Sequence, residues 1–264
     1  MASLDAPCRT LARLPHGDPP PTTVRTTESP WGDPTGPASP SLHKDEYVTD
    51  ALHALQVALN DVDNLIEHHP KAAEPGRGRP TTDEGPLLRS CVLLIYAAWE
   101  VYVEDSLVWV VEQLANSAAP EHLPTALRSF VCDAIRADPW QLAGEGWRRV
   151  AVAAVVTRVR GAEDEDSFGM NTAGPRQINA LHAQVLGERP LDRCKWQKMP
   201  TKRVKEELAS LVRIRGAIAH TGKTPGQLHL KGVRDWRSFI QRLAGHLDGH
   251  LETWVDARTA AAGE

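Results

Sequence analysis

One apolar segment, residues 87–115, constrains the fold of this chain more than any other feature. Its sequence is LLRSCVLLIYAAWEVYVEDSLVWVVEQLA, which places apolar residues on nearly every face of a helix. Such a helix is stable when other helices surround it. Its longest run without charge, Cys91–Trp99, is well short of the ~20 apolar residues that a membrane span needs. We therefore predict a central buried helix over 87–115 and no membrane partner.

Apolar periodicity predicts further helices on both sides of this segment. From residue 45 onward, apolar residues recur at three- and four-residue spacing until His68, His69 and Pro70 end the run. Pro175 suits the first position of a helix, and Gly187 and Gly222 suit the positions just after helix ends. The further helices are expected over 124–137, 145–160, 175–186, 201–220 and 232–255. Because no alternating strand and no internal repeat is found, we predict an all-α fold.

The first 42 residues differ from the rest in composition. Nine of the 20 prolines lie in residues 1–40, among many Ser, Thr and Gly, and apolar periodicity is absent. A segment of this kind buries too little apolar surface to fold. We predict a disordered Pro-rich tail over 1–42 and a helical domain over 43–258.

The formal net charge of −4 conceals a basic segment. Residues 189–242 contain 14 Lys and Arg against four Asp and Glu, a net charge of +10, so the remainder carries −14. Such an asymmetry points to a polyanionic partner. A basic face that packs on the protein's own acidic helices would give the same count, and charge alone does not decide between the two.

Cysteine and histidine spacing argues against metal sites and disulfides. The four cysteines (Cys8, Cys91, Cys132, Cys194) lie far apart and form no Cys-x-x-Cys pair. His246 and His250 could face one metal ion from a helix, but no third ligand stands at a suitable spacing, so no cofactor is expected. Because the N-terminus lacks the apolar core of a signal peptide, we expect a cytoplasmic protein with reduced thiols.

Three acids interrupt the apolar segment. A carboxylate within an apolar helix costs free energy unless it is paired or solvated. Glu100 and Glu104 are four residues apart and share a helix face, and Asp105 follows them directly. These acids either border a cleft or pair with a basic helix, and we favour an internal salt bridge.

Arg215 and His220 end the helix expected over 201–220. Arg can hold a phosphate through two hydrogen bonds, and His can move a proton near neutral pH, so the pair suits phosphodiester cleavage without a metal. With 22 Arg and 11 His, about one Arg-x4-His pair is expected by chance. Five residues rotate a helix by about 500°, which leaves the two side chains about 140° apart. One site therefore needs the long Arg to reach round the helix, or a second copy of the helix.

Three segments, in order along the chain, carry a family resemblance. LLRSCVLLIYAAWEVYVEDSL is similar to the first core helix of RiboL-PSP-HEPN proteins, with its A-x-E-x-Y-x-E-D stretch. FGMNTAGPRQINALHAQVLG resembles the family's Asn/Thr-then-Pro helix start and its Ile-Asn-x-Leu…Leu-Gly ending. IRGAIAHTG matches the Arg-x4-6-His motif. The chain thus resembles the HEPN (higher eukaryotes and prokaryotes nucleotide-binding) domain over about residues 87–222.

The resemblance implies a homodimeric all-α bundle that acts as a metal-independent endoribonuclease, in toxin–antitoxin or anti-phage systems. In this mechanism the ribose 2′-oxygen attacks the adjacent phosphate. Arg215 would bind that phosphate, His220 would be the acid/base, and Glu100 would border the site. A cognate antitoxin would be a further partner. Within the basic segment, we expect Arg213, Lys223, Lys202 and Lys205 to contact RNA.

Two features keep alternatives open. Gly216 stands where the family often has Asn or another polar residue, and some members have lost catalysis. A non-catalytic module that binds RNA, nucleotide or a partner protein is therefore the alternative to an enzyme. In a third interpretation, Arg215 and His220 only cap a helix of a structural protein. Arg213 also stands in register, as Arg-x6-His, so either arginine could contact the phosphate.

Overall fold

The computed structural model describes residues 49–69, 84–162, 169–224 and 226–260. In these ranges the chain forms seven α-helices and three short 3₁₀ turns and no strand, and Trp196 and Met199 form an isolated bridge. The predicted all-α fold is confirmed, whereas the tail predicted over 1–42 lies outside the described residues. The helices are α1 (Asp50–Glu67), α2 (Glu84–Ser117), α3 (Thr125–Ala134), α4 (Gly146–Arg160), α5 (Pro175–Leu186), α6 (Thr201–Thr221) and α7 (Leu230–Ala260).

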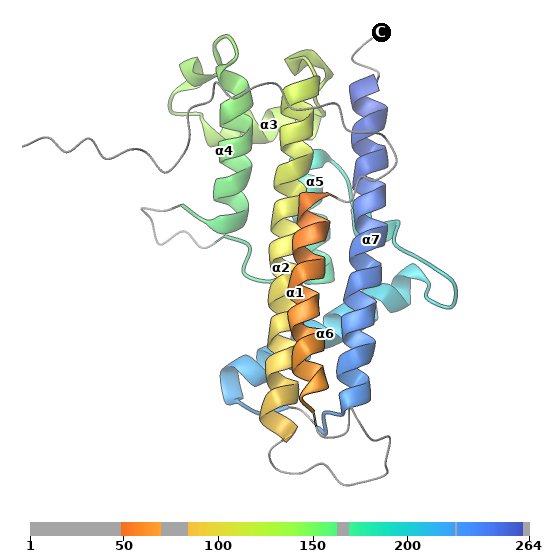
Figure 1. Cartoon of the computed structure of the whole chain (residues 1–264). Helices are drawn as coiled ribbons and strands as arrows, with labels where there is room; N and C mark the ends of the chain where they lie inside the picture. The colour runs from red at the N-terminus through yellow and green to blue at the C-terminus, as the bar shows by residue number, and fades with distance from the viewer. Residues whose placement is uncertain (1–48, 70–83, 163–168, 225, 261–264) are drawn as a thin grey trace, which may run out of the picture. The chain divides into compact units, whose positions relative to one another are not determined.

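Helix α2 is the centre of the bundle, as predicted (Figure 1). Helices α1, α4, α6 and α7 all pack against it, and Tyr96, Trp99 and Tyr102 are among its fully buried side chains. By length and composition the segment Gly85–Ser117 is apolar enough to cross a membrane. The charge-free run Cys91–Trp99 within it is too short to do so alone. Half of its most apolar stretch is buried among the other helices, as in the core helix of a globular protein.

The helix ends follow local sequence signals. Thr49 caps α1, since its hydroxyl accepts a hydrogen bond from the Leu52 amide at 3.1 Å. Pro175 opens α5, and Gly187 ends it with φ 76°. The helix predicted over 124–137 ends early, at Ala134, where Ile135 leaves helical geometry with φ −111° and ψ 23°. The last helix is longer than predicted and begins before Gly232, at Leu230.

A buried carboxyl group ties three helices together. Asp248 of α7 accepts a hydrogen bond from the Thr49 hydroxyl at 2.6 Å. The Tyr102 hydroxyl lies 3.3 Å from the same oxygen and 3.0 Å from the Ala244 carbonyl. Burial raises the pKa of Asp248, and the two hydroxyl donors oppose that rise. This cluster fixes the start of α1 and the middle of α2 on α7.

Helix α6 crosses the bundle and brings two parts of the basic segment to different sides. The segment before α6 contacts α7 through Trp196, and Arg215 near the end of α6 contacts α2. In Figure 1 the segment before α6 projects beside α7, and the end of α6 emerges on the other side of α2. The two ends of α6 therefore offer separate surfaces.

Candidate functional site

Arg215 is held against α2 by an acid and an aromatic ring. Its Nη2 lies 3.3 Å from Oε2 of Glu100, and its guanidinium carbon lies 4.7 Å from the centre of the Tyr96 ring. About a third of the Arg215 side chain and a fifth of the Glu100 side chain remain exposed. The expected internal salt bridge between the acids of α2 and a basic helix is thereby confirmed for Glu100.

Tyr96 joins this pair to the loop before α5, a role that the sequence analysis missed. Its hydroxyl oxygen accepts a hydrogen bond from the Ala173 amide at 2.9 Å, and Trp99 donates to the Ala173 carbonyl at 2.9 Å. Burial raises the pKa of Tyr96, so the hydroxyl stays protonated and donates a hydrogen bond to the Glu100 carboxylate. The only sequence signal was the four-residue spacing of Tyr96 and Glu100, which places both on one face of a helix.

The three acids of α2 have different surroundings. Burial raises the pKa of Glu100, and the charge of Arg215 opposes this rise. Asp105 pairs with Arg160 of α4 at 2.5 Å. Glu104 has no ion pair among the described residues. Burial raises its pKa to about 7, Arg160 opposes the rise, and the neighbouring charges of Asp105 and Glu100 reinforce it. Glu104 is therefore a carboxyl that can exchange a proton near neutral pH.

The outer face of α6 carries His220 and Arg213. Both side chains are exposed, and neither makes an ion pair or a side-chain hydrogen bond with the part of the chain that the structure describes. They are seven residues apart, a rotation of about 700°, so they share one face two turns apart. Arg215 lies on another face of the helix. The structure thus distinguishes the two arginines, either of which could contact the phosphate by sequence: Arg215 is braced on α2, and Arg213 faces solvent on the face of α6 that carries His220.

The lysines that we expect to contact RNA differ in their exposure and in whether an acid pairs with them. Lys223 is exposed just after α6. Lys202 lies 3.9 Å from Glu206 and is largely exposed. Lys205 instead pairs with Asp192. Lys202 and Lys205, together with Arg176, line an open pocket of about 470 Å³ between the start of α5 and α6.

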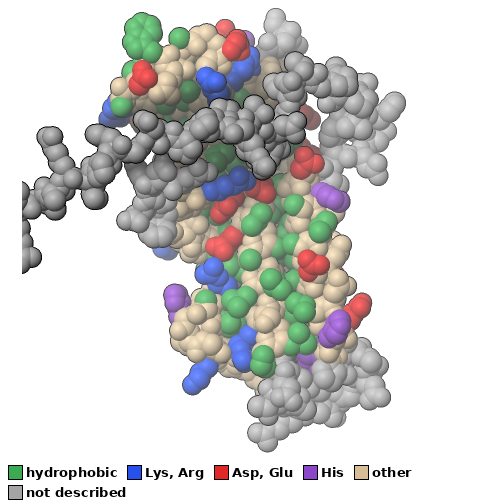
Figure 2. Space-filling view, turned by 60° about the vertical axis from the view of Figure 1, so that its left-hand side comes forward, with side chains coloured by type: hydrophobic (Ala, Val, Ile, Leu, Met, Phe, Trp, Pro, Cys, Tyr) green, Lys and Arg blue, Asp and Glu red, His purple; other side chains and the backbone are tan. Residues whose placement is uncertain are grey.

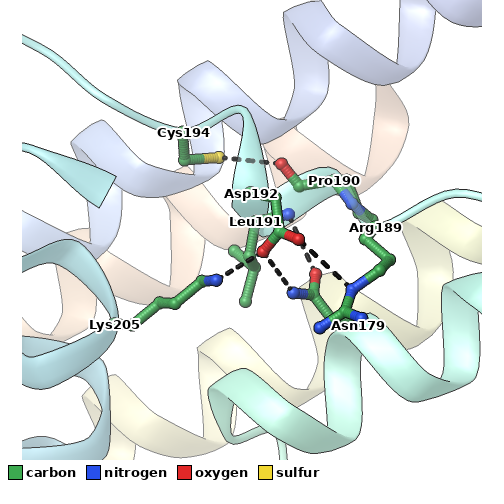
Figure 3. A network of polar contacts seen from close by, with 7 residues as sticks. All are labelled: Asn179, Arg189, Pro190, Leu191, Asp192, Cys194 and Lys205. Atoms are coloured by element: carbon green, nitrogen blue, oxygen red, sulfur yellow. Dashed lines mark hydrogen bonds and ion pairs between the residues drawn. The ribbon is translucent and has the colours of Figure 1, made fainter. Parts of the chain in front are cut away.

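Asp192 is the centre of a polar network that fixes the start of the basic segment (Figure 3). It pairs with Lys205 of α6 and with Arg189, whose Nε is 3.2 Å away, and it accepts a hydrogen bond from Asn179 of α5 at 2.8 Å. The side-chain oxygen Oδ1 of Asn179 in turn accepts a hydrogen bond from the Leu191 amide at 3.1 Å. The hydrogen bond from Lys205 is the main reason why the pKa of Asp192 lies below its usual range. Lys205 therefore has a structural contact in this chain.

Half of the 14 cations in residues 189–242 form ion pairs with acids in the described ranges. Only two of these pairs, Arg215 with Glu100 and Arg237 with Asp63, reach an acid outside the segment. Packing on the protein's own acidic helices thus accounts for a small part of the excess charge. The cations without an ion pair to described residues are Arg193, Lys195, Lys198, Arg213, Lys223, Arg234 and Arg242.

The histidines of α7 do not form a metal centre with other described residues. No group of three or more His, Cys, Asp or Glu lies close enough to hold an ion within the described ranges. His246 stacks on Trp196, with ring centres 5.0 Å apart. Burial lowers the pKa of His250. The cysteines that the structure describes, Cys91, Cys132 and Cys194, are free thiols.

Comparison with protein-family models, with curated proteins and with solved structures finds no match to this chain.

Proposed function

We propose that this protein is a metal-independent endoribonuclease of the HEPN type, active as a homodimer. One observation carries the proposal: the last turns of α6 hold an arginine braced on α2, Arg215, together with an exposed His220 and an exposed Arg213. An ion pair and an aromatic ring fix the first cation, and the imidazole faces solvent, where RNA has access. The excess of unpaired cations in the same segment supports a polyanionic substrate.

The chemistry needs a cation for the phosphate and a group that moves protons. The ribose 2′-oxygen attacks the adjacent phosphorus and loses its proton, the bond to the 5′-oxygen breaks, and that oxygen gains a proton. The products are a 2′,3′-cyclic phosphate and a 5′-hydroxyl. His220 transfers the proton, and the guanidinium of Arg215 stabilises the charge on the phosphate oxygens.

A second copy of the chain completes the site. Within one copy, Arg215 and His220 point about 140° apart on α6, so Arg215 of one copy acts with His220 of the other. Helices α1 and α2 expose three large apolar side chains, Val57, Leu94 and Val101, and Val101 directly follows Glu100 in α2. Figure 2 shows one face of the bundle on which hydrophobic side chains gather, with charged groups around them. Such a patch supports a two-fold interface, in which the same surface of each copy is buried.

The test is cleavage of a synthetic RNA by the purified chain in the presence of a chelator. Removal of a positioned acid/base lowers the rate by about 10²–10⁴-fold, so His220→Ala should lose cleavage to that extent. His229→Ala is the matched control, since His229 is also exposed and lies in the loop before α7. Wild-type products should carry 2′,3′-cyclic phosphates. A His220→Ala chain that cleaves as fast as the wild type overturns the proposal.

A non-catalytic module that binds RNA, nucleotide or a partner protein is the second candidate, and the Arg215–Glu100 pair favours it. An arginine whose charge is balanced by a carboxylate at 3.3 Å attracts a phosphate less strongly than an arginine without an ion pair. RNA binding that weakens steeply with salt, without products even at excess protein, would support this candidate.

We place the activity in the cytoplasm, in a toxin–antitoxin or anti-phage system with a cognate antitoxin. Expression in bacteria tests this setting. The wild type should arrest growth and degrade cellular RNA, and His220→Ala should do neither. Growth that is equal in the two strains at equal protein levels contradicts a toxic role.

A further inference from the structure

We propose that the turn at Trp196–Met199 and the adjoining face of α7 form a binding surface for single-stranded RNA, separate from Arg215 and His220. The proposal concerns binding and does not depend on cleavage. It rests on an aromatic stack, a fixed turn and a local group of cations that have no counter-charge among the described residues.

The aromatic stack lies at the centre of this surface. The rings of Trp196 and His246 are parallel within 1°, with centres 5.0 Å apart. The guanidinium carbon of Arg242 lies 5.7 Å from the centre of the Trp196 ring, and Phe239 supports the same ring from the core at 6.1 Å. His246 and Arg242 are exposed. A nucleobase can therefore extend the stack on the imidazole, as aromatic and guanidinium groups do in proteins that bind single strands.

The turn that carries Trp196 is held in one conformation. Trp196 and Met199 exchange backbone hydrogen bonds of 3.1 and 2.9 Å. Lys198, at the tip of the turn, has φ 62°. Every other described residue with a positive φ is a glycine. A side chain in this left-handed region is strained, and such strain is typical of positions that bind a ligand. The turn presents the exposed Lys198 ammonium to solvent at a fixed place.

The base of the turn is anchored in the bundle. Asp192 precedes the turn in the chain, and its network joins α5 to α6 (Figure 3). Cys194 is buried, and its thiol lies 3.6 Å from the Pro190 carbonyl. The surface is therefore formed before any ligand arrives, which lowers the entropic cost of binding.

The charged side chains on the two segments that carry the stack, residues 193–205 and 236–247, are all positive. Arg193, Lys195, Lys198 and Arg242 are exposed and have no ion pair with described residues. No Asp or Glu occurs in residues 193–205 or in residues 236–247 of α7. Cations beside stacked rings match the two parts of a single strand, its phosphates and its unpaired bases. A double helix keeps its bases stacked inside, so the aromatic stack favours a single strand.

The test measures binding of a labelled 12-nucleotide single-stranded RNA, and of its duplex, to the full chain carrying His220→Ala. Loss of two phosphate contacts in Lys198→Gln/Arg242→Gln should weaken binding at least tenfold and reduce the salt slope by about 1.4, since each contact to a single strand contributes about 0.7. His246→Ala should weaken binding of the single strand about fivefold or more, and binding of the duplex much less. Arg234→Gln is the matched control, because Arg234 is also an exposed, unpaired cation of α7, and it should stay within twofold.

Two results overturn the proposal. One is a Lys198→Gln/Arg242→Gln chain that binds the single strand as tightly as its parent. The other is a His246→Ala chain that loses single strand and duplex equally, since that leaves no role for stacking. All variants should keep the melting temperature of their parent. Because binding is measured in a background without His220, failure of the cleavage proposal leaves this result intact, and the reverse also holds.

Discussion

Arg215 of α6 lies 3.3 Å from Glu100 of α2 and stacks on Tyr96, although 115 residues separate the two charged groups along the chain. The pair has two consequences. It fixes the crossing of α6 on the central helix, and it sets the position of the arginine that the proposed mechanism needs. The loop before α5 is part of the same unit, since Tyr96 and Trp99 both bond to Ala173.

Removal of the Glu100 charge should destabilise the fold and release Arg215. In Glu100→Gln, a partly buried guanidinium loses its counter-charge, and we expect a loss of about 1 kcal/mol in the free energy of unfolding. In the double variant with Arg215→Gln, the two losses should not add. A double-mutant cycle by urea unfolding measures the coupling. Fully additive losses would show that the pair does not stabilise the crossing.

Glu104 should make stability depend on pH above about 5. Its pKa of about 7 in the folded protein lies above the ordinary value of 4.5. The stability that the neutral carboxyl contributes is complete below pH 4.5 and is lost as the pH rises through 7. Glu104→Gln should therefore be more stable than wild type at pH 8, by about 1 kcal/mol after allowance for solvent screening, and equal to it at pH 4. Thermal melts of both proteins across this range check the result, with the exposed Glu112→Gln as control. A gain that is the same at pH 4 and pH 8 contradicts the assignment.

His182 should make the protein sensitive to acid. The side chain is fully buried on α5, its Nδ1 bonds to the Ile178 carbonyl at 2.9 Å, and its Nε2 has no partner in the described structure. Burial lowers its pKa from 6.5 to about 4, and the charge of His250 adds to this effect. The stability that the neutral His182 side chain contributes is fully present above pH 6.5. It falls by about 3 kcal/mol as the pH drops through 4.

Replacement of His182 by Leu isolates this effect. The substitution fills the same space and leaves no unpaired nitrogen, so stability at pH 7 should change by about 1 kcal/mol or less. Urea unfolding between pH 7 and pH 4 should show a weaker pH dependence than in the wild type. An unchanged slope would mean that His182 does not titrate on unfolding.

Two glycines of the proposed site should respond in opposite directions to alanine. A Cβ on Gly216 meets no atom within 4 Å, so Gly216→Ala should stabilise α6 by up to about 1 kcal/mol. Gly222 has φ 66°, where alanine is strained, so Gly222→Ala should destabilise the protein by about 1 kcal/mol. Chemical denaturation of the two variants gives both values. A destabilising Gly216→Ala in the dimer, but not in the dissociated chain, would place Gly216 in the interface between copies.

Local signals were sufficient to predict the helices. Pro175 and Gly187 are the first residue and the end signal of α5, and the apolar segment after residue 87 became the central helix. These features depend on neighbours within a few residues, which the sequence shows directly.

The contacts of the candidate site depend on packing between distant segments. The sequence indicated that the acids of α2 pair with a basic helix, but not that Tyr96 completes the pair. It favoured Arg215 for the phosphate but left Arg213 open as an alternative, because only the orientation of α6 on α2 decides which arginine is braced. The Trp196–His246 stack joins a turn to α7, and no spacing in the sequence predicts it. Likewise, counting charges could not show that Lys205 forms an ion pair with Asp192.

The central claim is that Arg215 of one copy and His220 of another act on the same phosphate. The direct measurement is RNA cleavage by an equal mixture of Arg215→Ala and His220→Ala chains that have been dissociated and reassembled. Each variant alone should be inactive. About half of the mixed dimers should contain both chains, and each of those has one intact site, so the mixture should regain about a quarter of wild-type activity. A mixture that forms mixed dimers and remains as inactive as either variant contradicts the account.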